Sequence, residues 1–66
     1  MSLKALQGFV RIVELDSFSE AADALFLSQS ALSQQIRVLE AQLKVQLFQH
    51  AQRRVALTPA GWEFYP

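Results

Sequence analysis

The feature that most restricts the fold of this sequence is a pair of helix-start signals set close together, at Ser17 and at Ser28. Ser17-Phe18-Ser19-Glu20 has the pattern of a capping box, in which the hydroxyl and the carboxylate satisfy each other's exposed backbone amides. Ser28 is a good N-cap for the next helix. The helix between them is therefore short, and it leaves space for a turn of only about three or four residues. Two helices joined in this way predict a helix-turn-helix.

An apolar stripe at helical spacing precedes this pair and predicts a first helix over about residues 3–15. The stripe consists of Leu3, Leu6, Phe9, Val10 and Val13. The second helix, ending by about residues 26–27, turns inward the side chains of Ala21, Ala22 and Leu25. Its small alanines allow another helix to approach closely. The third helix runs from Ser28 to about Leu43.

The pattern changes after residue 43. Two short β-like runs, Leu47-Phe48 and Val55-Ala56-Leu57, flank the segment 50–54 and predict a two-stranded wing. Thr58-Pro59 then supplies an N-cap followed by proline, which predicts a fourth helix of no more than about two turns. The expected fold is mainly α: a winged helix-turn-helix with a three-helix core, a two-stranded β wing and the start of a truncated helix.

Length and composition exclude several classes of function. A chain of 66 residues forms one domain with about 3–5 kcal/mol of core stability, which leaves no room for a catalytic cleft. The sequence has no cysteine and no glycine-rich phosphate loop, and no carboxylate or second histidine accompanies His50 at metal spacing. We therefore expect no enzyme, no cofactor and no metal site. Without a leader or a long apolar run, we expect a cytoplasmic location and no membrane partner.

The formal net charge is zero, which by itself argues against a nucleic-acid partner, because Lys and Arg drive phosphate binding. The charges are, however, unevenly distributed. Residues 1–27 carry two more acidic than basic side chains, whereas residues 28–58 carry three more basic than acidic ones. This division suits a domain whose second half faces a polyanion while its acidic first half faces away.

The third helix has two distinct faces when each residue is advanced by about 100° around the axis from Gln29. An apolar band near 310° consists of Leu32, Ile36, Leu39 and Leu43. A polar stripe between 0° and about 140° consists of Gln29, Ser30, Ser33, Gln34 and Arg37. The apolar band is expected to pack on the first two helices. The polar stripe is expected to be exposed.

The chemistry of the polar stripe is that of base-edge reading. Glutamine can bridge N6 and N7 of adenine, arginine can bridge O6 and N7 of guanine, and serine adapts to bases or phosphates. Each residue alone fits an ordinary solvated helix face equally well. Their joint placement favours DNA, as does the absence of acidic residues between Asp23 and Glu40. At the expected wing tip, Arg53 and Arg54 could enter a minor groove or contact its backbone.

The candidate DNA-binding set therefore combines the start of the third helix with the wing tip. It consists of Ser28, Gln29, Ser30, Ser33, Gln34, Arg37, Arg53 and Arg54. His50 is interpreted as a surface residue at a strand end. The aromatic side chains of Phe9, Phe18, Phe48 and Trp62 are assigned to the core, with Trp62 partly exposed.

Three linked motifs of this sequence resemble the LysR-type transcriptional regulators. They are Phe18-Ser19-Glu20-Ala21-Ala22-Asp23-Ala24-Leu25, then Ser28-Gln29-Ser30-Ala31-Leu32-Ser33-Gln34-Gln35-Ile36-Arg37-Val38-Leu39-Glu40, and Leu47-Phe48 followed by Leu57-Thr58-Pro59-Ala60-Gly61. By position, Gln29, Ser30, Ser33, Gln34 and Arg37 match the family's recognition helix, and Arg53 matches its wing arginine. The sequence departs from the family at Lys44, where glycine is usual. It departs again at His50, where an arginine that would contact phosphate is common.

The resemblance implies a bacterial DNA-binding domain over residues 1–58 and the start of a long linker helix over residues 59–66. It also implies a longer regulator, with a C-terminal domain that senses a small-molecule effector. Such regulators are homodimers or tetramers built largely on the linker helix, so this chain alone is expected to be a monomer or a weak dimer. The alternative function is protein association through the same polar face or the fourth helix.

Overall fold

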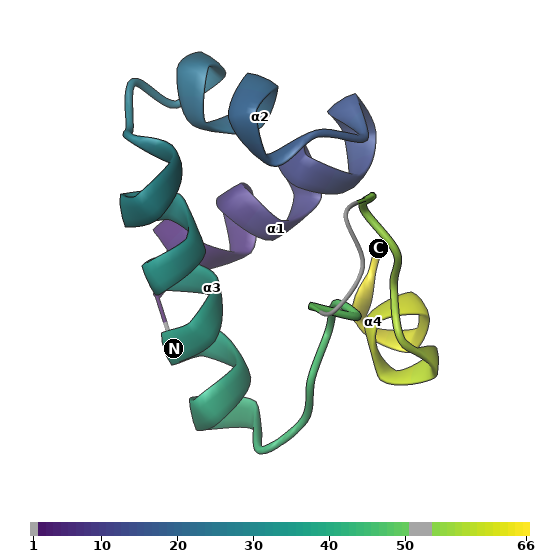
Figure 1. Ribbon diagram of the computed structural model, residues 1–66. Coiled ribbons are helices and arrows are strands. Elements are labelled where there is room, and N and C mark those ends of the chain that lie inside the picture. The colour runs from purple at the N-terminus through teal and green to yellow at the C-terminus, as the bar shows by residue number, and fades with distance from the viewer. Residues whose placement is uncertain (1, 51–53) are drawn as a thin grey trace.

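The computed structural model describes residues 2–50 and 54–66, and these residues form four helices. The helices are α1 (Leu3–Leu15), α2 (Phe18–Ala24), α3 (Gln29–Leu43) and α4 (Pro59–Phe64). Each of the first three packs against the other two, and α3 and α4 lie on opposite sides of α1 (Figure 1). The mainly helical helix-turn-helix fold is as the sequence predicts. No helix in this part of the chain is long and apolar enough to cross a membrane.

The core forms where these helices face the segment around Phe48. Phe9 of α1 is fully buried, and its ring lies 5.4 Å from that of Phe48 in an edge-to-face arrangement. Phe64 and Tyr65 approach the same ring of Phe9 from the end of α4. Trp62, by contrast, is 62% exposed. Burying the Phe9 ring therefore couples the three-helix core to α4.

A residue in the left-handed conformation follows each of the first three helices within two residues of its end. These residues are Asp16, Phe26 and Lys44, with φ of 53°, 58° and 60°. In all three turns the backbone amides of this residue and the next one bond back to carbonyls of the last helical turn, which is a Schellman motif. A helix end of this kind favours glycine, and none of the three is glycine. Lys44 thus adopts the left-handed conformation even though it stands where the family usually has glycine.

The start of α2 differs in one detail from the predicted capping box. The amide of Glu20 donates to Oγ of Ser17 at 3.0 Å, as expected. The amide of Ser17, however, donates to the carbonyl of Ile12 and not to the Glu20 carboxylate. The Ser17 amide, which a complete capping box would pair with the Glu20 carboxylate, therefore closes the end of α1 instead.

The wing is represented among the described residues by one antiparallel bridge between Phe48 and Leu57. Two backbone hydrogen bonds flank the bridge: Gln49 N donates to Ala56 O, and Thr58 N donates to Leu47 O. No strand is formed within residues 2–50 and 54–66, so the predicted two-stranded wing is not confirmed. The described part is a short ladder that joins residue 48 to residue 57. We call residues 47–50 and 55–58 the wing root.

Thr58 and Gly61 hold the start of α4 against the wing root. The hydroxyl of Thr58 donates to the carbonyl of Gln46 and accepts from the amide of Gly61 at 3.0 Å. A Cβ added at Gly61 would lie 2.2 Å from the carbonyl oxygen of Leu47. Only glycine allows the α4 backbone to come this close.

We expect Gly61→Ala to lower the free energy of unfolding by about 2–3 kcal/mol, because the added methyl collides with backbone that cannot move aside cheaply. The matched control is Gly8→Ala in α1, where the nearest atom is the end of the flexible Leu32 side chain, at 2.9 Å. That change should cost within about 1 kcal/mol, since alanine also favours the helix by about as much. Thermal unfolding followed by circular dichroism should show Gly61→Ala melting roughly 10–20 °C lower. Equal melting temperatures for the two variants would contradict this account of Gly61.

Candidate nucleic-acid interface

The two faces of α3 are divided as the sequence predicts. Leu32, Ile36 and Leu39 are completely buried. On the other face Gln29, Ser30, Gln34 and Arg37 are exposed, and Ser33 is half-buried. The helix thus presents two amides, a hydroxyl and a guanidinium to the outside of the molecule.

The hydroxyls of two serines at the start of α3 interact within the chain. Oγ of Ser28 accepts from the amide of Ala31 at 3.1 Å and lies 3.3 Å from Oγ of Ser30. The Ser28 hydroxyl therefore caps the helix. The extended backbone at Ser28 sets the direction in which α3 leaves the turn.

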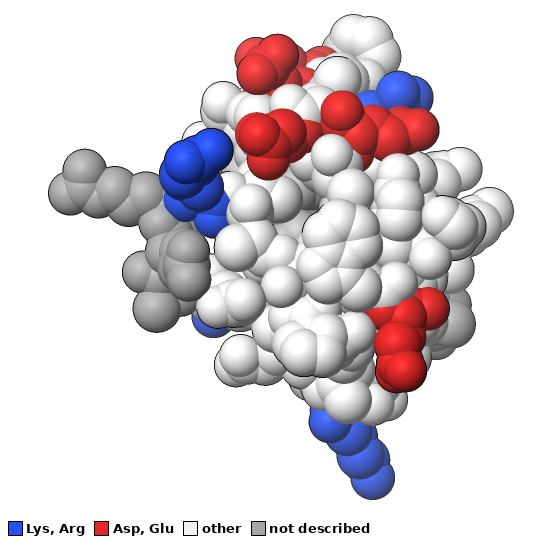
Figure 2. All heavy atoms as spheres, turned by 90° about the vertical axis from the view of Figure 1, so that its right-hand side faces the viewer, with Lys and Arg blue, Asp and Glu red and all other residues white. Residues whose placement is uncertain are grey.

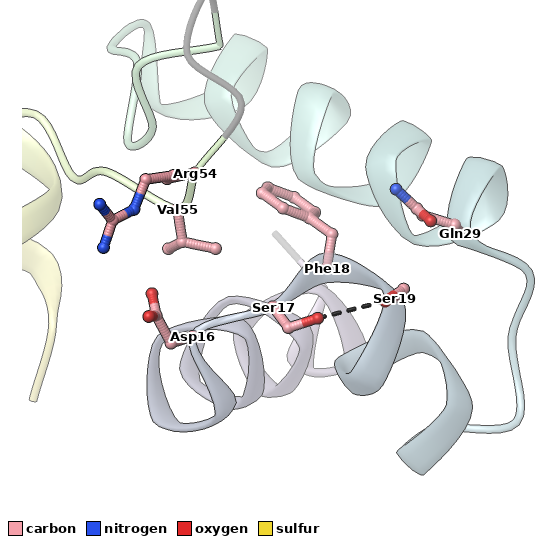
Figure 3. A pocket seen from close by; sticks show the side chains of 7 residues that line it. All are labelled: Asp16, Ser17, Phe18, Ser19, Gln29, Arg54 and Val55. Carbon is pink, nitrogen blue, oxygen red and sulfur yellow. Dashed lines mark hydrogen bonds between the residues drawn. The ribbon is translucent and has the colours of Figure 1, made fainter.

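A groove of about 340 Å³ joins the start of α3 to residues 54 and 55. Gln29 and Arg54 both line it, from segments far apart in sequence (Figure 3). The remaining lining residues belong to the α1–α2 corner and to the wing root: Asp16, Ser17, Phe18, Ser19 and Val55. Gln34 lies elsewhere, beside Ser2 and Lys4 at the start of α1. Arg53 lies outside the described residues. Of the candidate residues that the structure describes, Gln29 and Arg54 are the two that line this groove.

A buried carboxylate fixes the chain that follows α3. The side chain of Glu40 is 8% exposed. Its Oε2 accepts the backbone amides of Leu47 at 2.7 Å and Phe48 at 3.2 Å, and its Oε1 lies 2.7 Å from Nε2 of His50. An ionised carboxylate only accepts hydrogen bonds, so Nε2 of His50 donates to it. Glu40 thus holds residues 47, 48 and 50 of the wing root on α3.

The sequence places no carboxylate at metal spacing from His50, but the fold brings the Glu40 carboxylate to its ring from ten residues earlier. Its ring is half-buried between Glu40 and the ring of Phe48, whose centroid lies 6.3 Å away. The His50 side chain therefore points to Glu40. A sequence signal was available: Glu40 follows Ile36 by one helical turn, which puts an acid at the edge of the buried face. Its partner, ten residues later, leaves no periodic signal.

Acidic side chains gather on one part of the surface. In Figure 2, which looks onto the right-hand side of Figure 1, they lie at the top, where α1 ends and α2 lies. The acidic residues of these helices and their junction are Glu14, Asp16, Glu20 and Asp23. Asp16 does not follow the predicted division of charge, because it lines the same groove as Arg54. The acidic and the basic half of the chain meet there.

The fold and the exposed face of α3 together define a regulatory-type helix-turn-helix domain. Comparison with protein families gives the particular family. The pattern described as "Bacterial regulatory helix-turn-helix protein, lysR family" matches residues 3–62. The chain belongs to the LysR family.

Two relatives show how far the similarity extends. An uncharacterised HTH-type transcriptional regulator of Bacillus subtilis, YxjO, is 50% identical over 66 residues, which are 100% of this chain and 23% of that protein. The HTH-type transcriptional regulator BenM of Acinetobacter baylyi is 46% identical over 65 residues, which are 98% of this chain and 21% of that protein. The chain spans between a fifth and a quarter of the length of these two relatives.

Solved structures agree with this assignment. The crystal structure of the BenM_DBD/catB site 1 DNA complex matches with a TM-score of 0.91 and 46% identity, covering 98% of this chain and 73% of that one. The Corynebacterium glutamicum OxyR C206 mutant matches with a TM-score of 0.94 and 43% identity, covering 98% of this chain and 21% of that one. The helical arrangement described above is therefore that of LysR-family domains.

We expect Glu40→Gln to lower the free energy of unfolding by about 1–3 kcal/mol, because a neutral amide is a weaker acceptor for the amides of Leu47 and Phe48. Urea unfolding measures the loss. Hydrogen exchange should show both amides exchanging faster. Glu63→Gln is the matched control on exposed α4 and should change stability by less than about 0.5 kcal/mol. An equal effect of the two substitutions would show that the buried carboxylate does not hold the wing root.

Proposed function

We propose that this chain binds double-stranded DNA in a sequence-specific manner as the N-terminal head of a LysR-type regulator. In this proposal α3 enters the major groove and the wing lies on the adjacent minor groove or its backbone. The observation that carries the proposal is the exposed face of α3, which has hydrogen-bonding side chains and no acid from Gln29 to Val38. A face without carboxylates lets phosphates approach closely.

The known relatives support this assignment. A BenM_DBD structure that contains catB site 1 DNA has the same helical arrangement at 46% identity. At this level of identity, a shared way of docking is the simplest expectation. We extend to this chain the DNA binding that the BenM_DBD complex records.

Individual roles follow from the chemistry of the side chains. Gln29 and Gln34 suit adenine edges, and Arg37 suits guanine. Ser30 and Ser33 suit bases or phosphates, while Ser28 positions the first turn of α3. Arg53 and Arg54 suit the minor groove or its backbone, with Arg53 assigned by the family pattern alone. The Arg54 guanidinium has no described ion-pair partner, so it is available to a phosphate.

The finer organisation is proposed with the function. We assign residues 1–58 to the DNA-binding domain, with a two-stranded wing built on Leu47-Phe48 and Val55-Ala56-Leu57, and residues 59–66 to the start of the linker helix. The full-length regulator would be a cytoplasmic homodimer or tetramer that binds a small-molecule effector through a C-terminal domain. The head alone would be a monomer or a weak dimer that binds one half-site weakly.

An amide-shift titration by NMR with duplex DNA at low salt tests the proposal directly, because it detects weak binding and locates it. Shifts concentrated in residues 28–37 and 50–54 are expected. A folded spectrum that does not respond to DNA would contradict DNA binding by this chain and favour protein association through the same face.

We expect Gln29→Ala to reduce discrimination between matched and mismatched base pairs by about 1–3 kcal/mol, because one bidentate base contact is lost. Arg54→Ala should instead weaken all duplexes alike and reduce the salt slope of binding by about one. Gln42→Ala is the control, since Gln42 lies on the same helix about 220° from Gln29 and off the polar stripe. Fluorescence anisotropy with sets of matched and altered duplexes gives both quantities. Equal loss on every duplex with Gln29→Ala would rule out its role as a base reader.

A further inference from the structure

Opposite charges face each other across the groove beside the start of α3. Asp16 belongs to the α1–α2 corner, and Arg54 lies at the start of the segment that returns to the bridge at Leu57. Figure 3 shows the carboxylate and the guanidinium directed toward one another from separate walls of the groove, with Gln29 on a further wall. The two groups form no ion pair among the described residues. Arg54 is therefore near an anion without being bound to it.

The backbone at Asp16 does not require a carboxylate. Its φ of 53° and ψ of 38° are left-handed, and glycine or asparagine adopts this conformation at least as readily as aspartate. The helix dipole also disfavours negative charge at this position, because Asp16 directly follows the C-terminal end of α1. Local structure therefore gives no reason for the charge, and the one basic side chain of the groove does.

We propose that Asp16 limits the DNA affinity of this domain by competing with DNA phosphates for the guanidinium of Arg54. The inference rests on the proposed function, because it concerns an arginine assigned to DNA contact. The Asp16 carboxylate attracts the same guanidinium that a DNA phosphate would contact, and charges closer than about 8 Å interact at physiological salt. Both side chains are exposed, so solvent screening keeps the effect modest.

The role differs from that of a helix cap. The cap function of Asp16 uses its backbone amide, which donates to Val13, and any residue tolerated in the left-handed region preserves it. The affinity-limiting function uses only the carboxylate. The substitution Asp16→Asn separates the two, because it removes the charge and keeps both the shape and the tolerance of a left-handed backbone.

The test measures binding of a fluorescein-labelled mixed-sequence duplex by anisotropy at several salt concentrations. We expect Asp16→Asn to tighten binding about two- to five-fold, the range of a solvent-exposed charge pair, and to steepen the salt dependence. Its melting temperature should not fall. Asp23→Asn is the matched control, because it makes the same change of net charge on α2, at a residue that does not line the groove. Its effect should be clearly smaller.

An Arg54→Gln background completes the cycle, because competition for a guanidinium requires that guanidinium. There Asp16→Asn should no longer tighten binding. If it tightens binding equally with and without Arg54, or no more than Asp23→Asn does, the inference fails while DNA binding stands. If the wild-type chain binds no duplex at any salt concentration, the proposed function itself fails.

Discussion

The carboxylate of Glu40 joins α3 to the wing root. It is buried on α3 and accepts the amides of Leu47 and Phe48 while it contacts His50. A buried carboxylate is costly unless hydrogen bonds compensate it, so this arrangement holds only while all three donors stay in place. The position of the wing root is thereby fixed relative to α3 by one side chain.

The rest of the C-terminal part builds on that fixed root. Once residues 47 and 48 are held on α3, Phe48 enters the core against Phe9, and Leu57 pairs with Phe48 across the bridge. Thr58 and Gly61 then bring α4 onto the Leu47 backbone, at a distance that only glycine tolerates. The groove that contains Gln29 and Arg54 depends on this chain of contacts, because Arg54 is carried by the segment that returns to the bridge. The proposed DNA interface therefore depends on residues that stabilise the domain and do not themselves belong to the candidate DNA-binding set.

Electrostatics in this small domain act at two levels of burial. The Glu40–His50 pair is largely shielded from water, so its role is to position the chain. Asp16 and Arg54 are exposed, so their interaction is weak and open to competition by a polyanion. A net charge of zero therefore does not conflict with DNA binding. What matters is which charges are already compensated inside the molecule and which are free at the groove.

The sequence by itself determined the features that have a local physical cause. Helical periodicity and the caps at Ser17, Ser28 and Thr58 predicted all four helices and the two faces of α3, because these signals act within a few residues. Only the tertiary structure decided that His50 meets Glu40 and that Asp16 shares a groove with Arg54. Such contacts arise from how helices cross and where the wing root returns, and their partners have no fixed spacing along the chain.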